Sequence, residues 1–137
     1  MAYLLDTNVV SEAASKNPDA KVIEWCENNA ASCFVSCITL GEIRKGIHLM
    51  PEGKRRNALN AWASRLANEL PHPCLPVDAG VLEIWGELYA KSQIAGVELD
   101  VLDSLIAATA IRHRLVVVTW NTGDFPPEVE TVNPWLD

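Results

Sequence analysis

Two acidic residues follow predicted β-strands, at the strand ends where open α/β sheets bind their ligands. Asp6 comes directly after the apolar run 3–5, and Asp124 lies in the loop that follows the apolar run 115–118. The carboxyl ends of parallel strands form one edge of a sheet. We therefore expect Asp6 and Asp124 to face the same small region outside that edge.

Two further acidic residues lie in or near the first turns of predicted helices. Glu42 follows Thr39 by three residues, and Asp103 follows Asp100 by three. If both helices begin beside the same strand ends, four carboxylates converge. Like charges within about 4–6 Å of each other raise one another's pKa and destabilise the fold. A divalent cation would remove that conflict, so the pattern predicts a metal site.

A carboxylate site of this kind suits Mg²⁺, which takes oxygen ligands and keeps several bound waters. Mn²⁺ accepts the same carboxylate and water ligands. Either ion can lower the pKa of a bound water and screen the charge that develops on a phosphoryl oxygen. The chemistry that these acidic residues indicate is therefore phosphodiester hydrolysis.

Each acidic residue also has a simpler structural interpretation. Asp6 and Asp103 could do no more than cap the helices that they begin. Glu42 could pair with Lys45, three residues on, at the surface of one helix. Asp124 could be a turn residue. One shared site explains all four positions together, whereas the simpler interpretations must be assumed one by one.

The composition describes one globular domain over residues 1–137. The chain is 49% hydrophobic and 21% charged, and a chain of this length can bury a full core without disulfides or a structural metal. No apolar stretch approaches the roughly 20 residues that cross a bilayer, and the first residues lack the basic segment of a secretory signal. We therefore expect a cytoplasmic protein with no membrane role and with reduced cysteines.

The charge of the chain is unevenly distributed. The formal net charge is −7, yet the segment 44–65 contains six basic residues and one acidic residue. Nucleic acids are bound mainly through Lys and Arg. The segment, which begins with Arg44 and Lys45, could therefore contact a nucleic acid although the whole chain is acidic.

The elements that must position these residues alternate between strands and helices. Short apolar runs predict strands at residues 3–5, 33–36, 74–77, 115–118 and 131–133. Apolar positions at helical spacing predict helices that begin after Asp6, Asp19 and Asp78 and near Thr39, Glu52 and Asp100. This alternation predicts an α/β fold, a three-layer α/β/α sandwich around a mainly parallel sheet.

Five motifs stand in order along the chain. They are Leu5-Asp6-Thr7-Asn8, Ser36 with Thr39-x-x-Glu42 and Gly46, Asp103-x-Leu105-Ile106-Ala107-Ala108-Thr109-Ala110, Val118-Thr119-x-Asn121-x-x-Asp124-Phe125, and Asn133-Pro134-Trp135. With these motifs the chain resembles PIN-domain proteins, specifically the VapC and FitB-type toxins of bacterial toxin–antitoxin pairs. The resemblance spans nearly the whole chain.

The resemblance implies a PIN-like fold and a Mg²⁺- or Mn²⁺-dependent endoribonuclease. Its metal ligands would be Asp6 and Asp103, with Asp124 completing the site. Glu42 would hold a second ion or orient the attacking water. The substrate would be RNA, cut at phosphodiester bonds.

Smaller roles follow from the same resemblance. Thr7 and Thr119 would supply hydroxyls, and Asn121 an amide, to water or phosphate. Trp120 stands where many relatives carry arginine. It could stack on an unpaired base, or it could pack as a partly exposed aromatic side chain.

The resemblance also implies partners. Members of the family are homodimers, and a small antitoxin neutralises them by blocking the site and also binds operator DNA. The basic segment 44–65 would then bind RNA or form part of the dimer or antitoxin surface. An alternative remains open, which is a non-catalytic module of the same fold that binds an antitoxin and nucleic acid without cutting it.

Other catalytic patterns have less support. A haloacid-dehalogenase-type phosphatase needs a second Asp where this chain has Asn8. A receiver-type signalling domain needs a late lysine, and no lysine follows Lys91. The three histidines share no spacing with a Ser or Cys nucleophile, so a catalytic triad has no support either.

Overall fold

The computed structural model describes residues 1–136, and its strands and helices alternate as the sequence predicts. The strands are β1 (Tyr3–Leu5), β2 (Cys33–Val35), β3 (Val116–Val118) and β4 (Thr131–Val132). The α-helices are α1 (Thr7–Glu12), α2 (Ala20–Asn28), α3 (Cys37–His48), α4 (Lys54–Glu69), α5 (Ala79–Ile94) and α6 (Val101–His113). Two short 3₁₀ turns, η1 (Ala30–Ser32) and η2 (Thr122–Asp124), lie in the connections.

The four strands form one parallel sheet in the order β2-β1-β3-β4. Tyr3 of β1 pairs with Cys33 on one side and with Val116 on the other, and β4 joins the outer side of β3. Because all pairs are parallel, the carboxyl ends of β1, β2 and β3 lie along the same edge. The predicted parallel sheet is therefore confirmed.

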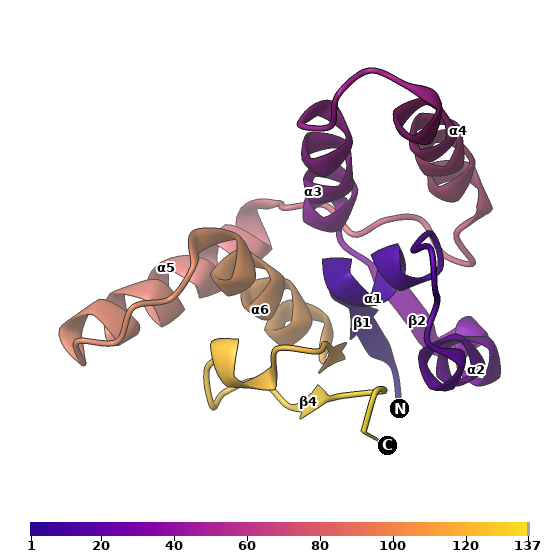
Figure 1. The fold of residues 1–137 in the computed structure, drawn as a ribbon. Helices are drawn as coiled ribbons and strands as arrows, with labels where there is room; N and C mark the ends of the chain where they lie inside the picture. Colours follow the sequence, from indigo (N-terminus) through magenta and orange to yellow (C-terminus); the bar gives the residue numbers. More distant parts are fainter. Residues whose placement is uncertain (137) are drawn as a thin grey trace.

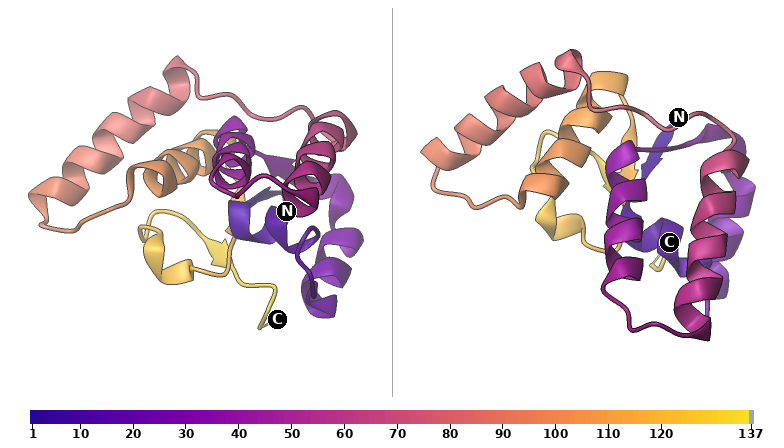
Figure 2. Two further views of the ribbon diagram at one scale, coloured as in Figure 1. Left: turned by 45° about the horizontal axis from the view of Figure 1, so that its top comes forward. Right: turned by 90° about the horizontal axis from the view of Figure 1, so that it is seen from above.

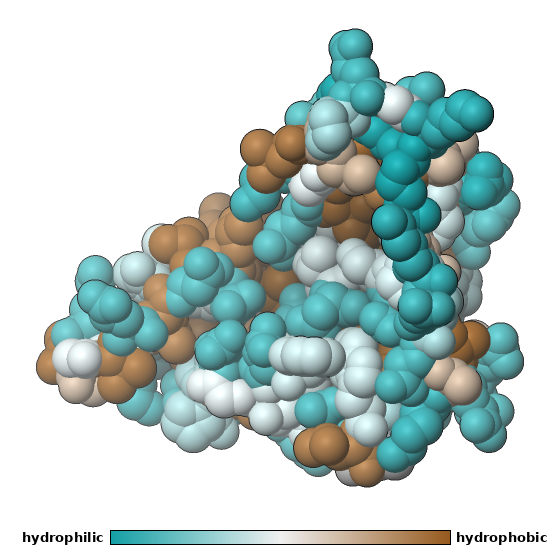
Figure 3. Space-filling model, in the orientation of Figure 1, coloured by the Kyte–Doolittle hydropathy of each residue, from teal (hydrophilic) through white to brown (hydrophobic). Residues whose placement is uncertain are grey.

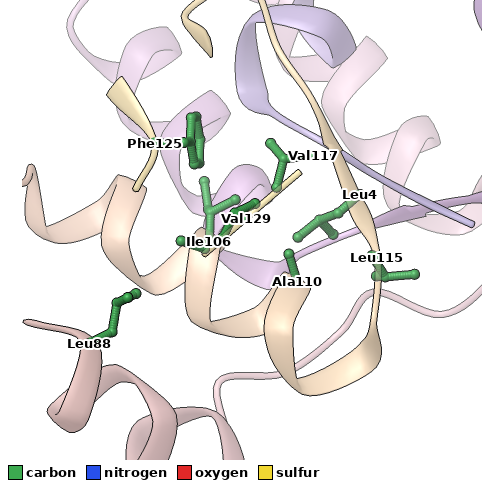
Figure 4. Close-up of a cluster of buried hydrophobic side chains, with 9 residues drawn as sticks. Leu4, Leu88, Ile106, Ala110, Leu115, Val117, Phe125 and Val129 are labelled. Carbon is green, nitrogen blue, oxygen red and sulfur yellow. The ribbon is translucent and has the colours of Figure 1, made fainter. Parts of the chain in front are cut away.

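Helices cover both faces of this sheet (Figures 1 and 2). On one face, Leu4 and Val117 pack with Ile106 and Ala110 of α6 and with Leu88 of α5 (Figure 4). The residues that follow them point to the other face, where α1 and α2 lie beside β1 and β3. Side chains alternate between the faces of a strand, so three-residue strands suffice to hold two helical layers apart. The α/β/α sandwich is confirmed.

Four aspartates cap the helices that the sequence predicts after them. The side chains of Asp6, Asp19, Asp78 and Asp100 each accept a hydrogen bond from a backbone N–H in the first turn of α1, α2, α5 and α6. Such caps satisfy N–H groups that have no partner within the helix. The cap of α6 matters most for the site, because Asp100 accepts from the N–H of Asp103 at 3.0 Å.

The start of α3 was predicted near Thr39, and this prediction is wrong by two residues. The helix begins at Cys37, because the hydroxyl of Ser36 accepts a hydrogen bond from the N–H of Ile38 at 3.1 Å and caps it. Glu42 therefore lies in the second turn of α3 and not in the first. It still lies at the edge of the buried face of the helix.

The predicted strand 74–77 is also absent from the sheet. Only Leu75 pairs, through an isolated bridge with Ser36, in which its N–H donates to Val35 and its carbonyl accepts from Cys37. Pro73 and Pro76 flank Leu75, and proline has no N–H to donate to a sheet. The segment therefore touches the end of β2 without extending as a strand.

Two helical pairs extend from the sheet in different directions (Figure 1). The surface over α4 is hydrophilic, whereas the surface along α5 is partly apolar (Figure 3). The exposed side chains of Leu82 and Ile94 contribute to the apolar surface of α5. Within residues 1–136, no helix is both long enough and apolar enough to cross a membrane.

Candidate active site

Asp6 lies buried between the ends of β1 and β3, with only 4% of its surface exposed. Its N–H donates to the carbonyl of Val118 on the neighbouring strand. One carboxylate oxygen, Oδ1, accepts from the N–H of Thr7 at 2.8 Å. The other, Oδ2, accepts from the hydroxyl of Thr119 at 2.8 Å and from the amide of Asn8 at 3.2 Å. Three donors therefore hold this buried carboxylate in one orientation.

Asn8 is a residue of the site that the sequence analysis missed, since it appeared there only within the Leu5-Asp6-Thr7-Asn8 motif and as an argument against a phosphatase. Its Nδ2 donates to Asp6 and to the hydroxyl of Thr119, and its Oδ1 accepts from the backbone N–H of Trp120 at 3.0 Å. The side chain thus joins the end of β1 to the end of β3. The only signal was its place in the Asp-Thr-Asn motif.

Thr119 contacts the carboxylate of Asp6 from the residue after β3. Its side chain is fully buried, and its hydroxyl donates to Asp6 while it accepts from the N–H of Asn121 at 3.1 Å. In this structure Thr119 therefore holds the carboxylate of Asp6 in place. Its expected contact with water or phosphate stays a prediction.

Glu42 reaches the same edge of the sheet from α3. Its Oε1 accepts a hydrogen bond from the hydroxyl of Thr7 at 2.7 Å. This contact joins α3 to α1, which Asp6 begins. Among residues 1–136 the one ion pair found is Lys91 with Glu128, so Glu42 does not form the surface pair with Lys45 that was its alternative interpretation.

Asp103 shows that the acidic residues act on one another. It lies partly buried in the first turn of α6. Burial, followed by the charges of Asp6, Asp100, Glu42 and Asp124, raises the pKa of Asp103 to about 7. Like charges and desolvation together thus bring the pKa of this carboxyl group close to physiological pH, where about half of the groups are protonated. The structure therefore brings all four candidate acids, with Asp100 beside them, into one electrostatic site.

Asp124 and Asn121 form the outer side of this site. Both are exposed, and Asp124 ends the η2 turn that follows β3. Its own N–H donates to the carbonyl of Asn121 at 3.0 Å, which closes the turn. Neither side chain is engaged in a hydrogen bond within the part of the chain that the structure describes. Both remain free to meet a ligand.

The three expected substrate contacts have different environments. The guanidinium of Arg44 donates to Asn60 and Ser64 of α4, so it joins two helices. Lys45 is exposed on the next position of α3. Trp120 is 58% exposed directly after Thr119, at the edge where the acids meet. Of the three expected substrate contacts, Arg44 is therefore the one whose side chain is already engaged, in joining α3 to α4.

The donor set fits a hard divalent cation, although the side chains do not form a finished metal site. Carboxylate oxygens are the ligands that Mg²⁺ and Mn²⁺ prefer. Over residues 1–136, no three acidic, histidine or cysteine side chains meet at metal-binding distances. Asp6 is fixed, whereas Asp103 carries the unfavourable charge. A cation shared by these carboxylates would relieve the repulsion that raises the pKa of Asp103.

A cavity of about 570 Å³ adjoins the site between α5 and the loop after β3. Asp100, Asp103 and Asp124 line it together, while Leu88 and Phe125 belong to its apolar wall. Away from the site the lining is mixed, because Lys91, Glu98 and Glu128 also belong to it. A ligand lying there would have direct access to Asp103.

This fold and its acidic edge define a PIN domain. The PIN domain family matches residues 3–126, and the chain belongs to that family. The match contains all four candidate acids.

Relatives of known name cover nearly the whole chain. Toxin FitB of Neisseria gonorrhoeae is 35% identical over 98% of this chain and 99% of its own length. VapC ribonuclease Y4jK of Sinorhizobium fredii is 33% identical over 96% of both chains. Among solved structures, FitAB bound to an IR36 DNA fragment superimposes with a TM-score of 0.88 at 33% identity, over 97% of this chain and 95% of the other. These are the proteins to which the chain is similar.

Proposed function

We propose that this protein is a metal-dependent endoribonuclease that hydrolyses phosphodiester bonds of RNA. The observation that carries the proposal is the arrangement of four acids at the carboxyl edge of a parallel sheet, where burial and the charges of Asp6, Asp100, Glu42 and Asp124 raise the pKa of Asp103. A fold keeps such repulsion where a cation offsets it. The similarity to VapC ribonuclease Y4jK supports RNA as the substrate.

Asp6, Asp103 and Asp124 would hold Mg²⁺, with Mn²⁺ as a second possible ion. The bound ion supplies a water of lowered pKa and screens charge on the phosphoryl oxygen. Around it, Thr119 and Asn8 hold the carboxylate of Asp6 in its orientation.

Glu42 would act on the attacking water. The hydroxyl of Thr7 donates to Oε1 of Glu42, which leaves Oε2 to accept a proton. A positioned carboxylate that accepts this proton is the usual form of general base catalysis. Thr7 therefore orients the base, and its hydroxyl does not need to touch the substrate.

The basic segment 44–65 would contact the RNA backbone through its exposed charges. Arg44 is engaged with α4, and Arg55 donates to the carbonyl of Ala14. Lys45, Lys54 and Arg65 are exposed. Phosphate contacts of this kind raise affinity without sequence preference and weaken as salt rises.

The proposed biological role is that of the toxin in a toxin–antitoxin pair. A cognate antitoxin would cover the site, operator DNA would be bound only through that antitoxin, and two copies of the chain would form a homodimer. Support comes from Toxin FitB and from the solved FitAB complex with DNA. The four cysteines are free thiols, in keeping with a place in the reducing cytoplasm, where RNA would be met.

The test is cleavage of a mixed RNA pool by the purified, antitoxin-free protein with Mg²⁺, with Mn²⁺ and with a chelator. We expect cleavage with either metal, none with chelator, and a loss of at least about 100-fold in Asp6→Asn and Asp103→Asn, since each removes a proposed ligand. Glu83→Gln, which changes an exposed acid on α5 far from these acids in sequence, is the matched control. Asp6→Asn and Asp103→Asn should both unfold cooperatively on heating, which shows that they are folded.

A folded protein that binds RNA but cuts none with any metal would refute the nuclease and support the non-catalytic module. Equal cleavage by wild type and Asp103→Asn would refute the assignment of the site. Cleavage that persists in chelator would refute the proposed dependence on a metal ion.

A further inference from the structure

Trp120 presents a large aromatic side chain to solvent at the edge of the candidate active site. It follows Thr119, whose hydroxyl donates to the carboxylate of Asp6. The ring is 58% exposed, although the neighbouring residues of β3 are buried. An aromatic ring in this place stands beside the residues that would act on the substrate.

Both polar groups of the Trp120 backbone form hydrogen bonds with side chains. Its N–H donates to Oδ1 of Asn8 at 3.0 Å, and its carbonyl accepts from Nδ2 of Asn133 at 3.4 Å. The same Asn8 donates to Oδ2 of Asp6 at 3.2 Å. One side chain thus joins the backbone of Trp120 to the carboxylate that would hold the metal.

The ring itself rests on Trp135. The two ring centroids lie 5.3 Å apart with an interplanar angle of 87°, which is an edge-to-face contact. Trp135 is partly buried and packs against Val9, Val22 and Val118. In an edge-to-face pair at most one face of Trp120 is covered by its partner. Trp135 therefore leaves at least one face of the Trp120 ring uncovered, in keeping with the 58% exposure of this residue.

We propose that Trp120 is a stacking platform for one unpaired base of the RNA substrate, and that the substrate is therefore single-stranded at this point. The inference rests on the proposed nuclease function and adds the form of RNA that the site accepts. A base within a duplex has both faces stacked on its neighbours, whereas an unpaired base can turn outward onto an aromatic ring. A stacking surface of this kind accepts any base, because every base has a flat aromatic face.

The test compares three side chains at position 120 in the Asp103→Asn background, which allows binding to be measured without cleavage. Trp120→Phe keeps an aromatic face, and Trp120→Leu keeps apolar volume without one. All three retain the backbone N–H that donates to Asn8. The probe is a fluorescein-labelled RNA of about 12 nucleotides, single-stranded or annealed to its complement, and affinity is read by fluorescence anisotropy at low salt.

We expect Trp120→Leu to weaken binding of the single strand by about 5- to 150-fold, the range that one stacked base supplies. Trp120→Phe should stay within about threefold of the parent, because the aromatic face remains. Binding of the duplex should be the same in all three proteins. Ile94→Ala, which removes exposed apolar surface at the end of α5, is the control for a general loss of apolar surface.

Other results overturn the proposal in distinguishable ways. If the Asp103→Asn parent binds single-stranded RNA and Trp120→Leu binds it equally well, stacking is refuted and the nuclease assignment stands. If leucine and phenylalanine weaken binding alike, or if the duplex is affected as much as the single strand, the ring acts by packing. If the parent binds no RNA, the proposed function fails together with the stacking role.

Discussion

The four acids of the site fall into two pairs that the fold treats differently. The carboxylates of Asp6 and Glu42 accept hydrogen bonds from neighbouring residues. Two side chains and the backbone N–H of Thr7 donate to Asp6, and the hydroxyl of Thr7 donates to Glu42. Those of Asp103 and Asp124 accept none from residues 1–136. The protein's own donors orient the first pair of carboxylates, whereas no donor among the described residues orients the second pair.

This difference shows how a fold can hold a highly charged site. A buried carboxylate is tolerated where donors replace the water it has lost, as at Asp6. Asp103 lacks such donors, and its pKa rises to about 7. The unfavourable energy of the site is therefore concentrated on one residue, which a cation would stabilise most.

The largest expected effect on stability follows from Asp6→Ala. We expect the free energy of unfolding to fall by about 3 kcal/mol, because the cap of α1 is lost and the buried groups of Thr119 and Asn8 lose their acceptor. Urea denaturation of wild type and variant measures the change. Asp19→Ala also removes a helix cap, but no buried donor loses its acceptor. We expect its free energy of unfolding to fall by only about 1 kcal/mol. Equal losses in the two variants would contradict the difference between the pairs.

Asp103→Asn is expected to raise the free energy of unfolding, in contrast to Asp6→Ala. The pKa of Asp103 is raised from 3.8 to about 7, so its charged form opposes folding. The penalty is absent below pH 3.8, grows as the pH rises towards 7, and is constant above. In metal-free buffer at about pH 8 the variant should be more stable by on the order of 2 kcal/mol, and near pH 4 the gain should vanish.

Denaturation at several pH values in chelator measures this gain. Glu83→Gln should show no such pH-dependent difference from wild type. A lower stability of Asp103→Asn at about pH 8 would mean that the negative charge at the start of α6 stabilises the helix more than the other acids destabilise it.

Addition of Mg²⁺ should stabilise the fold through the second pair, Asp103 and Asp124. Mg²⁺ at ten times its Kd stabilises a folded protein by about 1.4 kcal/mol if it binds only the folded state. We expect this gain in wild type at about pH 8 and a smaller one at about pH 5, where Asp103 is protonated. Thermal melts with and without metal measure it. An equal gain in Asp103→Asn would contradict the role of Asp103 as a ligand.

Two buried threonines give the smallest and most closely matched comparison. Thr119 donates to Asp6, whereas the hydroxyl of Thr39 has no hydrogen-bond partner among the described residues, and both are fully buried. Thr119→Val should lower the free energy of unfolding by about 1 kcal/mol, and Thr39→Val should leave it unchanged or raise it by about 0.5 kcal/mol. Denaturation curves of both variants decide this, and a loss in Thr39→Val would show a partner for its hydroxyl.

The amino-acid sequence by itself determined the features that depend on neighbouring residues. Asp19, Asp78 and Asp100 cap helices where their spacing predicts, because a cap joins a side chain to a backbone group at most three residues away. The apolar run at Val116–Val118 became a central strand, since a segment with no polar side must be covered on both faces. The start of α3 was misplaced because Ser36, also a cap, was assigned to the preceding strand.

Only the tertiary structure decided which distant residues meet. Thr119 and Asp6 are 113 residues apart in the chain, and Asn8 and Trp120 are 112 apart. Arg44, expected to meet RNA, is engaged by α4 because the two helices pack side by side. Local motifs in the sequence show which types of residue belong to the site. Their hydrogen-bond partners depend on the strand order β2-β1-β3-β4, which places the ends of β1 and β3 next to each other.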